Sequence, residues 1–195
     1  MLKRKNSKKI ILDLCGGTGE WSRWYALNGY DRRIITLPDR DVRTFEIPVN
    51  VYGILAAPDC RDFAGSGAQY WKAKDADGRT AESLKVVVAC IYIILSCKPI
   101  FWCMENPIGR LPELLPDLLG RPLMYYQPWE YGDPYTKKTC LWGEFNSPVK
   151  NPVEPIRSCS QGSWMQQLGG KSERTKLLRS ITPSGFAKAF YEANK

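Results

Sequence analysis

The sequence predicts an α/β fold with a mostly parallel sheet that carries helices on both faces. Two observations support this prediction. Apolar strand-like runs alternate with helical patterns along the chain, and glycine or proline ends most of them. With 195 residues, of which 44% are hydrophobic, the chain is expected to form one domain over residues 1–195.

The order of elements can be predicted along the whole chain. Strands are expected at residues 9–14, 33–37, 51–56 and 100–104, with two more at 123–127 and 139–142. Helices are expected at 20–28, 80–96, 111–119, 174–179 and 184–192. Thr80 should cap the second of these helices, which is rich in Val and Ile and should be buried. Residues 61–79 are expected to form a polar loop, and residues 144–163 to be irregular.

Composition restricts the chemistry that this protein can use. The chain has no histidine, which excludes histidine-based triads and the commonest metal ligand. Its seven cysteines form no close CxxC pair, so neither a zinc site nor a disulfide framework is expected. Proton transfer must therefore use carboxylates, Lys, Tyr, Cys or water. The longest apolar stretch, residues 86–97, is too short to span a bilayer, so a cytoplasmic protein is expected.

The formal net charge of +8 has two interpretations. Basic residues can simply keep a protein soluble, or they can attract a polyanion. They concentrate near the N-terminus and in a second group that includes Lys171, Arg174, Lys176 and Arg179. Charge alone does not separate the two interpretations, and it favours a nucleic acid only slightly.

A glycine-rich turn, Asp13-Leu14-Cys15-Gly16-Gly17-Thr18-Gly19, joins the first strand to the first helix. Its glycines let the backbone approach a ligand closely, and the helix behind them offers free N–H groups. The turn is neither a phosphate loop nor a full dinucleotide fingerprint. An ordinary strand-to-helix turn fits equally well. After the second strand, Asp39 or Asp41 could bind a ribose or an adenine amino group, or could lie in a solvated turn.

A cysteine follows the strand at residues 51–56. Cys60 lies in the polar segment Pro58-Asp59-Cys60-Arg61-Asp62-Phe63, which places it at a strand exit. Arg61 should favour its thiolate, whereas Asp59 should oppose it. A buried structural cysteine is the alternative interpretation.

A carboxylate follows the strand at residues 100–104. Burying Glu105 requires a partner, and the simplest interpretation pairs it with the nearby Arg110. Because the carboxyl ends of neighbouring parallel strands face one crevice, Glu105 and Cys60 can also meet over one substrate.

Together and in this order, these segments resemble those of the DNA cytosine-5 methyltransferases, which use S-adenosylmethionine. Residues 13–20 look like the first cofactor motif of that family, and residues 57–64 are similar to its nucleophile loop. Met104-Glu105-Asn106-Pro107 resembles its Glu-Asn-Val motif, and residues 131–139 resemble its Tyr-Gly-Val-Pro-Gln-x-Arg-x-Arg stretch. Residues 181–187 stand where the last helix of the family packs beside the cofactor. The resemblance covers residues 9–143 and the C-terminal end.

The resemblance implies a Rossmann-like S-adenosylmethionine-dependent methyltransferase fold. The implied reaction is methyl transfer to C5 of cytosine in DNA through a covalent cysteine adduct, without a metal. The implied catalytic residues are Cys60, Glu105, Asn106 and Lys137. The implied cofactor-binding residues are Asp13, Leu14, Cys15, Gly17, Gly19, Glu20, Trp21, Asp39, Asp41, Val42, Pro58 and Ser184.

The chain departs from the family pattern in its residues and in its length. Little sequence separates residue 142 from the last motif, where the family has a large target-recognition region. Residues 144–180 are then a reduced remnant of that region or a substitute for it, which implies a minimal, phage-like enzyme with low sequence selectivity. The departing positions are Cys15 for an aromatic residue, Asp59 for a proline, Tyr135 for a glutamine, and Lys137 and Thr139 for two arginines.

The implied partner is DNA with a flipped cytosine, in duplex or single-stranded form, and a partner subunit could supply recognition. We expect a monomer without a membrane partner, in the cytoplasm of a bacterium or a phage-infected host cell. Three alternatives remain open. The chain could methylate RNA or a free nucleotide, or it could transfer a modified group from an altered sulfonium cofactor. It could also be a non-catalytic nucleic-acid-binding relative, with Asp59 and Cys15 as signs of decay.

Overall fold

The computed structural model describes residues 6–160, 162–168 and 172–195. Its centre is a six-stranded sheet in the order β2-β1-β3-β4-β6-β5. The first four strands in this order are parallel, whereas β6 runs antiparallel to both of its neighbours. The predicted, mostly parallel sheet is therefore confirmed. The strands are β1 (Ile10–Leu14), β2 (Asp31–Ile35), β3 (Val51–Ala56), β4 (Phe101–Pro107), β5 (Met124–Tyr126) and β6 (Thr139–Glu144).

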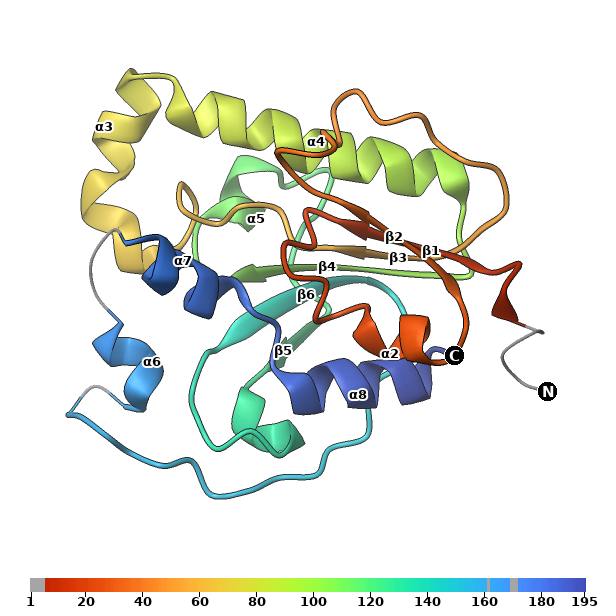
Figure 1. Cartoon of the computed structure of the whole chain (residues 1–195). Coiled ribbons are helices and arrows are strands. Elements are labelled where there is room, and N and C mark those ends of the chain that lie inside the picture. The colour runs from red at the N-terminus through yellow and green to blue at the C-terminus, as the bar shows by residue number, and fades with distance from the viewer. Residues whose placement is uncertain (1–5, 161, 169–171) are drawn as a thin grey trace.

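Helices cover both faces of the sheet, as Figure 1 shows. One face packs against α4, and the other packs against α2 and α8. The helices are α2 (Arg23–Leu27), α3 (Trp71–Ala76), α4 (Arg79–Cys97), α5 (Leu111–Leu114), α6 (Trp164–Gln167), α7 (Glu173–Ser180) and α8 (Ser184–Ala193), with the 3-10 helices η1 (Gly65–Tyr70) and η2 (Pro128–Tyr131).

Alternation along the strands divides the core into two clusters. Leu12 of β1 contributes to the cluster under α4, whereas its neighbour Ile11 contributes to the cluster under α8. The second cluster is mainly aromatic. In it, the Phe186 ring stacks on Tyr126 with centroids 3.8 Å apart and contacts Phe190 at 5.8 Å. The last helix is thus an integral part of the core.

Three sequence expectations between residues 61 and 97 were wrong. Most of the expected loop is helical, because η1 packs against α3 and α3 packs against α4. Gly78, with φ of 82°, occupies the N-cap of α4 instead of Thr80. The Thr80 hydroxyl instead donates to the Asp75 carboxylate at 2.6 Å. Moreover, α4 is buried on one face only, since Tyr92 on the other face is 66% exposed.

By length and composition alone, α4 could cross a membrane, since its best 18-residue window has a mean hydropathy of 1.7. Residues 86–97 are too short to span a bilayer, but they belong to a helix of 19 residues. The sequence expectation therefore underestimated the length of this apolar helix. However, Val87, Cys90 and Ile94 of α4 are buried in the core against the sheet. A core helix of this kind passes the same test of length and composition.

We expect Phe186→Ala to lower the free energy of unfolding by about 3–5 kcal/mol, because it removes a fully buried ring from the aromatic cluster. Urea denaturation followed by tryptophan fluorescence measures the loss. The control is Leu37→Ala, which removes a side chain that is 64% exposed and should have little effect. Equal losses in the two variants would contradict the assigned role of α8.

Candidate active site

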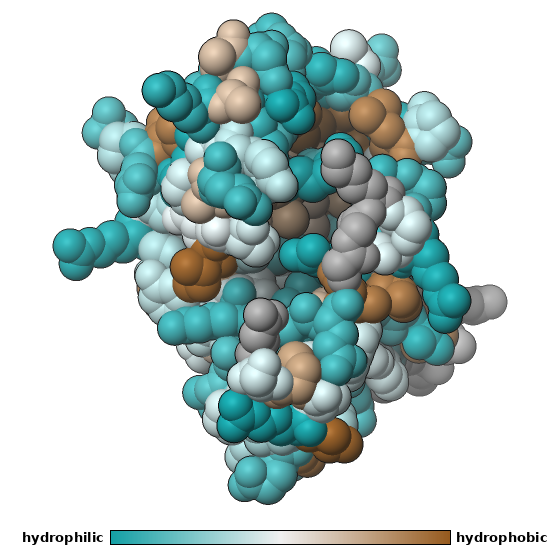
Figure 2. All heavy atoms as spheres, turned by 90° about the vertical axis from the view of Figure 1, so that its left-hand side faces the viewer, coloured by the Kyte–Doolittle hydropathy of each residue, from teal (hydrophilic) through white to brown (hydrophobic). Residues whose placement is uncertain are grey.

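The carboxyl ends of β1, β3 and β4 reach the same edge of the sheet. This face of the molecule is mostly hydrophilic and is hollowed near its centre, as Figure 2 shows. In an open α/β sheet, ligands bind at this edge. The three segments singled out in the sequence, after β1, after β3 and at the end of β4, therefore lie within one region.

The turn after β1 is built from left-handed backbone conformations. Cys15, Gly17 and Gly19 have φ values of 56°, 53° and 70°. A side chain at Gly19 would lie 2.4 Å from the Ile34 side chain, whereas Gly17 faces open space. The exposed backbone at Gly17 leaves room for a ligand above this turn. The Cys15 sulfur lies 4.0 Å from that of Cys90 on α4.

Asp13 lies beneath this turn and is completely buried. The Ser22 hydroxyl donates a hydrogen bond to one carboxylate oxygen, and the other has no donor within the described chain. Burial raises the pKa of Asp13 to about 6, while the Ser22 hydrogen bond and the charge of Arg32 oppose this rise. A buried, incompletely paired carboxylate favours a cationic ligand nearby. The site thus fits the positively charged sulfonium and ammonium groups of S-adenosylmethionine.

The two acidic candidates after β2 differ in their environment. Asp41 forms an ion pair with Arg43 at 2.6 Å, and this hydrogen-bonded arginine lowers the pKa of Asp41. Asp39 is exposed and lines an open hollow beside β2, together with Arg32 and Arg40. Of the two carboxylates, Asp39 is the one that is available to a ribose.

The remaining cofactor candidates lie in different surroundings. Leu14 and Val42 belong to the core cluster under α4. Trp21 is 2% exposed and packs against Phe190 at 5.6 Å, so its ring is part of the aromatic core. Glu20 forms an ion pair with Arg23 at 3.3 Å. At the far end of the chain, Ser184 is exposed at the start of α8.

One hydrogen bond joins the cysteine segment to the end of β4. The Asn106 side-chain amide donates to the Pro58 carbonyl at 3.0 Å, and both residues are buried. Glu105 lies inside β4, which is longer than expected because it pairs with the antiparallel β6. The structure therefore places Cys60 beside the strand that carries Glu105.

Arg110 does not pair with Glu105, so the simplest interpretation of that carboxylate is wrong. Its guanidinium instead binds the Asp75 carboxylate at 2.7 and 2.8 Å and donates to the Asp62 carbonyl at 3.2 Å. At Gly109, an added Cβ would lie 1.9 Å from the Phe63 carbonyl oxygen. Arg110 therefore fixes the segment after Cys60, a role that the sequence did not reveal.

Burial dominates the electrostatics around Cys60. Burial raises the pKa of the Cys60 thiol to about 11, and the negative charges of Glu105 and Asp59 add to the rise. Lys137 and Arg179 oppose it. Burial likewise raises the pKa of Glu105, which Lys137 counteracts. Before a ligand binds, the thiol is therefore protonated at neutral pH, and the carboxyl group is biased toward its neutral form.

Lys137 is the cation shared by the two groups. Its ammonium donates to the Ile181 carbonyl at 3.1 Å, and its backbone N–H donates to the Gln127 side chain at 2.8 Å. The described residues provide no hydrogen bond or ion pair to the Glu105 carboxylate. The charges of Glu105, Lys137 and Arg179 thus act on the Cys60 thiol, and Asn106 is tied to the same segment through the Pro58 carbonyl.

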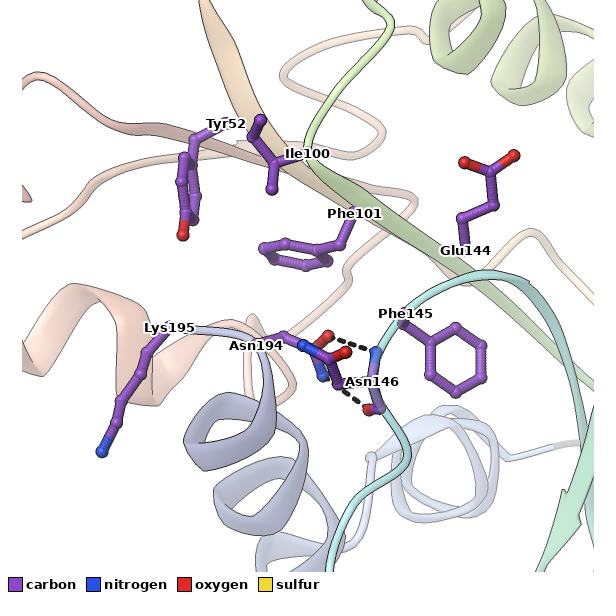
Figure 3. A pocket seen from close by; sticks show the side chains of 8 residues that line it. All are labelled: Tyr52, Ile100, Phe101, Glu144, Phe145, Asn146, Asn194 and Lys195. Carbon is purple, nitrogen blue, oxygen red and sulfur yellow. Dashed lines mark hydrogen bonds between the residues drawn. The ribbon is translucent and has the colours of Figure 1, made fainter.

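A separate pocket of about 170 Å³ opens at the other end of the sheet (Figure 3). It is lined by the amino-terminal ends of β3 and β4 and by the C-terminus of the chain. Asn194 and Asn146 close one side of it through reciprocal hydrogen bonds of 2.8 and 3.0 Å. It contains none of the predicted site residues, so we place the candidate active site at the carboxyl ends of the strands.

Comparisons with known proteins support the fold. No family model matches the chain, and no curated protein matches it in sequence. A crystal structure from E. coli, provisionally described as a DNA modification methyltransferase encoded within a prophage, has a TM-score of 0.51 and 15% identity. The match covers 85% of this chain but only 56% of that one. The chain thus has an α/β Rossmann-like methyltransferase fold.

We expect Asp13→Asn to stabilise the protein increasingly as pH rises. Because the folded-state pKa of about 6 exceeds the ordinary 3.8, ionised Asp13 costs stability once pH passes through this range. The gain should approach roughly 3 kcal/mol at pH 8 and vanish near pH 4. Chemical denaturation at both pH values measures it, with the exposed Asp117→Asn as the control. A gain independent of pH would contradict the assignment.

We expect Asp59→Asn to speed alkylation of Cys60 by iodoacetamide roughly threefold at pH 8, since it removes a negative charge that raises the thiol pKa. Peptide mass spectrometry distinguishes Cys60 from the other cysteines. The matched control is Asp77→Asn, because Asp77 and Arg79 form the same two-residue ion pair, at 2.5 Å, as Asp59 and Arg61. Unchanged alkylation in Asp59→Asn would show that Asp59 does not influence the thiol.

Proposed function

We propose that this protein transfers a methyl group from S-adenosylmethionine to C5 of cytosine in DNA, in the cytoplasm and with low sequence selectivity. The observation that carries the proposal is the convergence at one edge of the sheet of Cys60 after β3, Glu105 in β4 and Lys137 just before the antiparallel β6, in a methyltransferase-like fold. The structural neighbour named as a DNA modification methyltransferase supports the reaction class.

In the proposed reaction, Cys60 adds to C6 of the cytosine ring, which makes C5 nucleophilic. Glu105 suits the stabilising role, because a protonated carboxyl group donates to N3 while its other oxygen accepts from the amino group. The Lys137 ammonium offsets the negative charge of Glu105 whenever that carboxyl group is ionised. The cofactor supplies the methyl group that C5 receives. Loss of the C5 proton to water or a carboxylate then releases the Cys60 thiolate and restores the ring.

The raised pKa of Cys60 bears on how the nucleophile is activated. A thiol with a pKa of about 11 is almost fully protonated at neutral pH, so thiolate formation depends on cations at the site. The Cys60 proton can pass to the substrate or to solvent as sulfur adds. The same observation favours a second candidate, a non-catalytic nucleic-acid-binding relative. Mass spectrometry of nucleosides after incubation separates the two, and it also reveals any transferred group other than methyl.

Low selectivity is consistent with how residues 145–168 make their contacts. Backbone N–H groups of Asn151 and Val153 donate to carbonyls of Glu130 and Trp129, both at 2.9 Å. Further along, the Ser163 hydroxyl accepts from the Thr136 N–H at 3.0 Å. Residues 149–158 of this segment are exposed, but its described part contains no helix or strand other than the four-residue α6, so it offers little rigid surface for reading base edges.

We expect Cys60→Ser and Glu105→Gln each to lower methyl transfer by about 100-fold or more, because each removes a group that acts on the reacting ring. Incorporation of tritiated methyl groups into DNA, RNA and dCMP measures activity and identifies the acceptor. Cys97→Ser, at the end of α4, is the control and should retain activity. Incorporation by Cys60→Ser equal to that of the wild type would exclude the covalent mechanism.

A further inference from the structure

Helix α7 lies across the cysteine segment at the carboxyl edge of the sheet. At its C-terminal end, the Ile181 carbonyl accepts the hydrogen bond from Lys137 at 3.1 Å. At its N-terminal end, Arg61 is close enough to Glu173 to contribute, after Lys176, to lowering the pKa of that carboxylate. Figure 1 shows α7 in front of this edge. The C-terminal end of α7, which carries Arg179, is therefore positioned at the candidate active site by the contact with Lys137.

Arg179 is a cation without a protein partner at this site. Arg61 is bound by Asp59, and Lys176 is bound by Glu173, each at 2.5 Å. Within the described ranges, no ion pair or hydrogen bond engages the Arg179 guanidinium, and its side chain is exposed. A planar, unpaired guanidinium is well suited to bind a phosphate with two hydrogen bonds.

The charges around Cys60 leave little choice of where a phosphate can lie. Glu105 and Asp59 repel anions, and the Lys137 ammonium is engaged by a backbone carbonyl. A nucleotide whose base reaches Cys60 carries its phosphates at the mouth of the site, where α7 lies. From this geometry, we propose that Arg179 is a positioning residue that binds a phosphate flanking the target nucleotide. The substrate class is then a nucleic-acid strand with intact phosphodiesters, represented in the test by DNA, and a free base or nucleoside is excluded.

The inference rests on the proposed function only in placing a cytosine over Cys60, so its test does not require methyl transfer. A short single-stranded oligodeoxynucleotide with one cytosine is added, and the concentration that halves iodoacetamide alkylation of Cys60 is measured by peptide mass spectrometry. The same strand is prepared with an uncharged methylphosphonate on the 5′ or the 3′ side of the cytosine. The proteins are the wild type, Arg179→Ala, Arg179→Lys and Arg174→Ala.

We expect a methylphosphonate on one side to raise the half-protection concentration of the wild type about tenfold, the effect of one charge-assisted hydrogen bond. Arg179→Ala should show the same loss with the natural strand and no further loss with the methylphosphonate. Arg179→Lys should lie between it and the wild type. Arg174→Ala removes an equal charge from the same helix, roughly 140° around its axis, and should bind more nearly like the wild type.

Two results would overturn the assignment of Arg179. In the first, the fold-losses caused by Arg179→Ala and by the methylphosphonate are independent and multiply when both changes are combined. In the second, the oligonucleotide does not protect Cys60 at all. Non-additive losses without methyl transfer would leave Arg179 assigned while excluding the proposed reaction. Methyl transfer with multiplying losses would give the opposite conclusion, so the two hypotheses fail separately.

Discussion

The hydrogen bond from the Asn106 amide to the Pro58 carbonyl is the contact on which the candidate site depends. It is 3.0 Å long and fully buried, so neither partner could be left unpaired without a substantial free-energy cost. It ties the turn after β3 to the end of β4. Arg110 fixes the next part of that turn through the Asp62 carbonyl. The position of Cys60 relative to Glu105 is thus set by one buried and one partly buried contact.

Burial also explains the unusual charge states at this edge of the sheet. It raises the pKa values of Asp13, Cys60 and Glu105 alike, because each charged form loses hydration. Lys137 and Arg179 offset part of the effect at Cys60. Such a site favours neutral groups until a ligand brings further charge or hydrogen bonds. A proposed site for a neutral base and a cationic cofactor is consistent with this balance.

The small C-terminal region bears on how the proposed enzyme contacts DNA. The segment between β6 and α7 is held to the domain by backbone hydrogen bonds, and Arg179 of α7 contributes positive charge that is felt at Cys60. Contacts of this kind hold a phosphate backbone without reading its sequence. The proposed phosphate contact of Arg179 is therefore consistent with the proposed low sequence selectivity.

The sequence by itself determined the α/β class and the positions of β1, β3 and α8, because hydrophobic periodicity and glycine or proline breaks are local signals. It also singled out Cys60 and Glu105, since polar residues directly after apolar strands are conspicuous. Only the tertiary structure decided that Arg110 binds Asp75, that α3 is helical, and that the charge of Arg179 influences the thiol of Cys60. Each of these depends on partners far away in the chain, which no local pattern records.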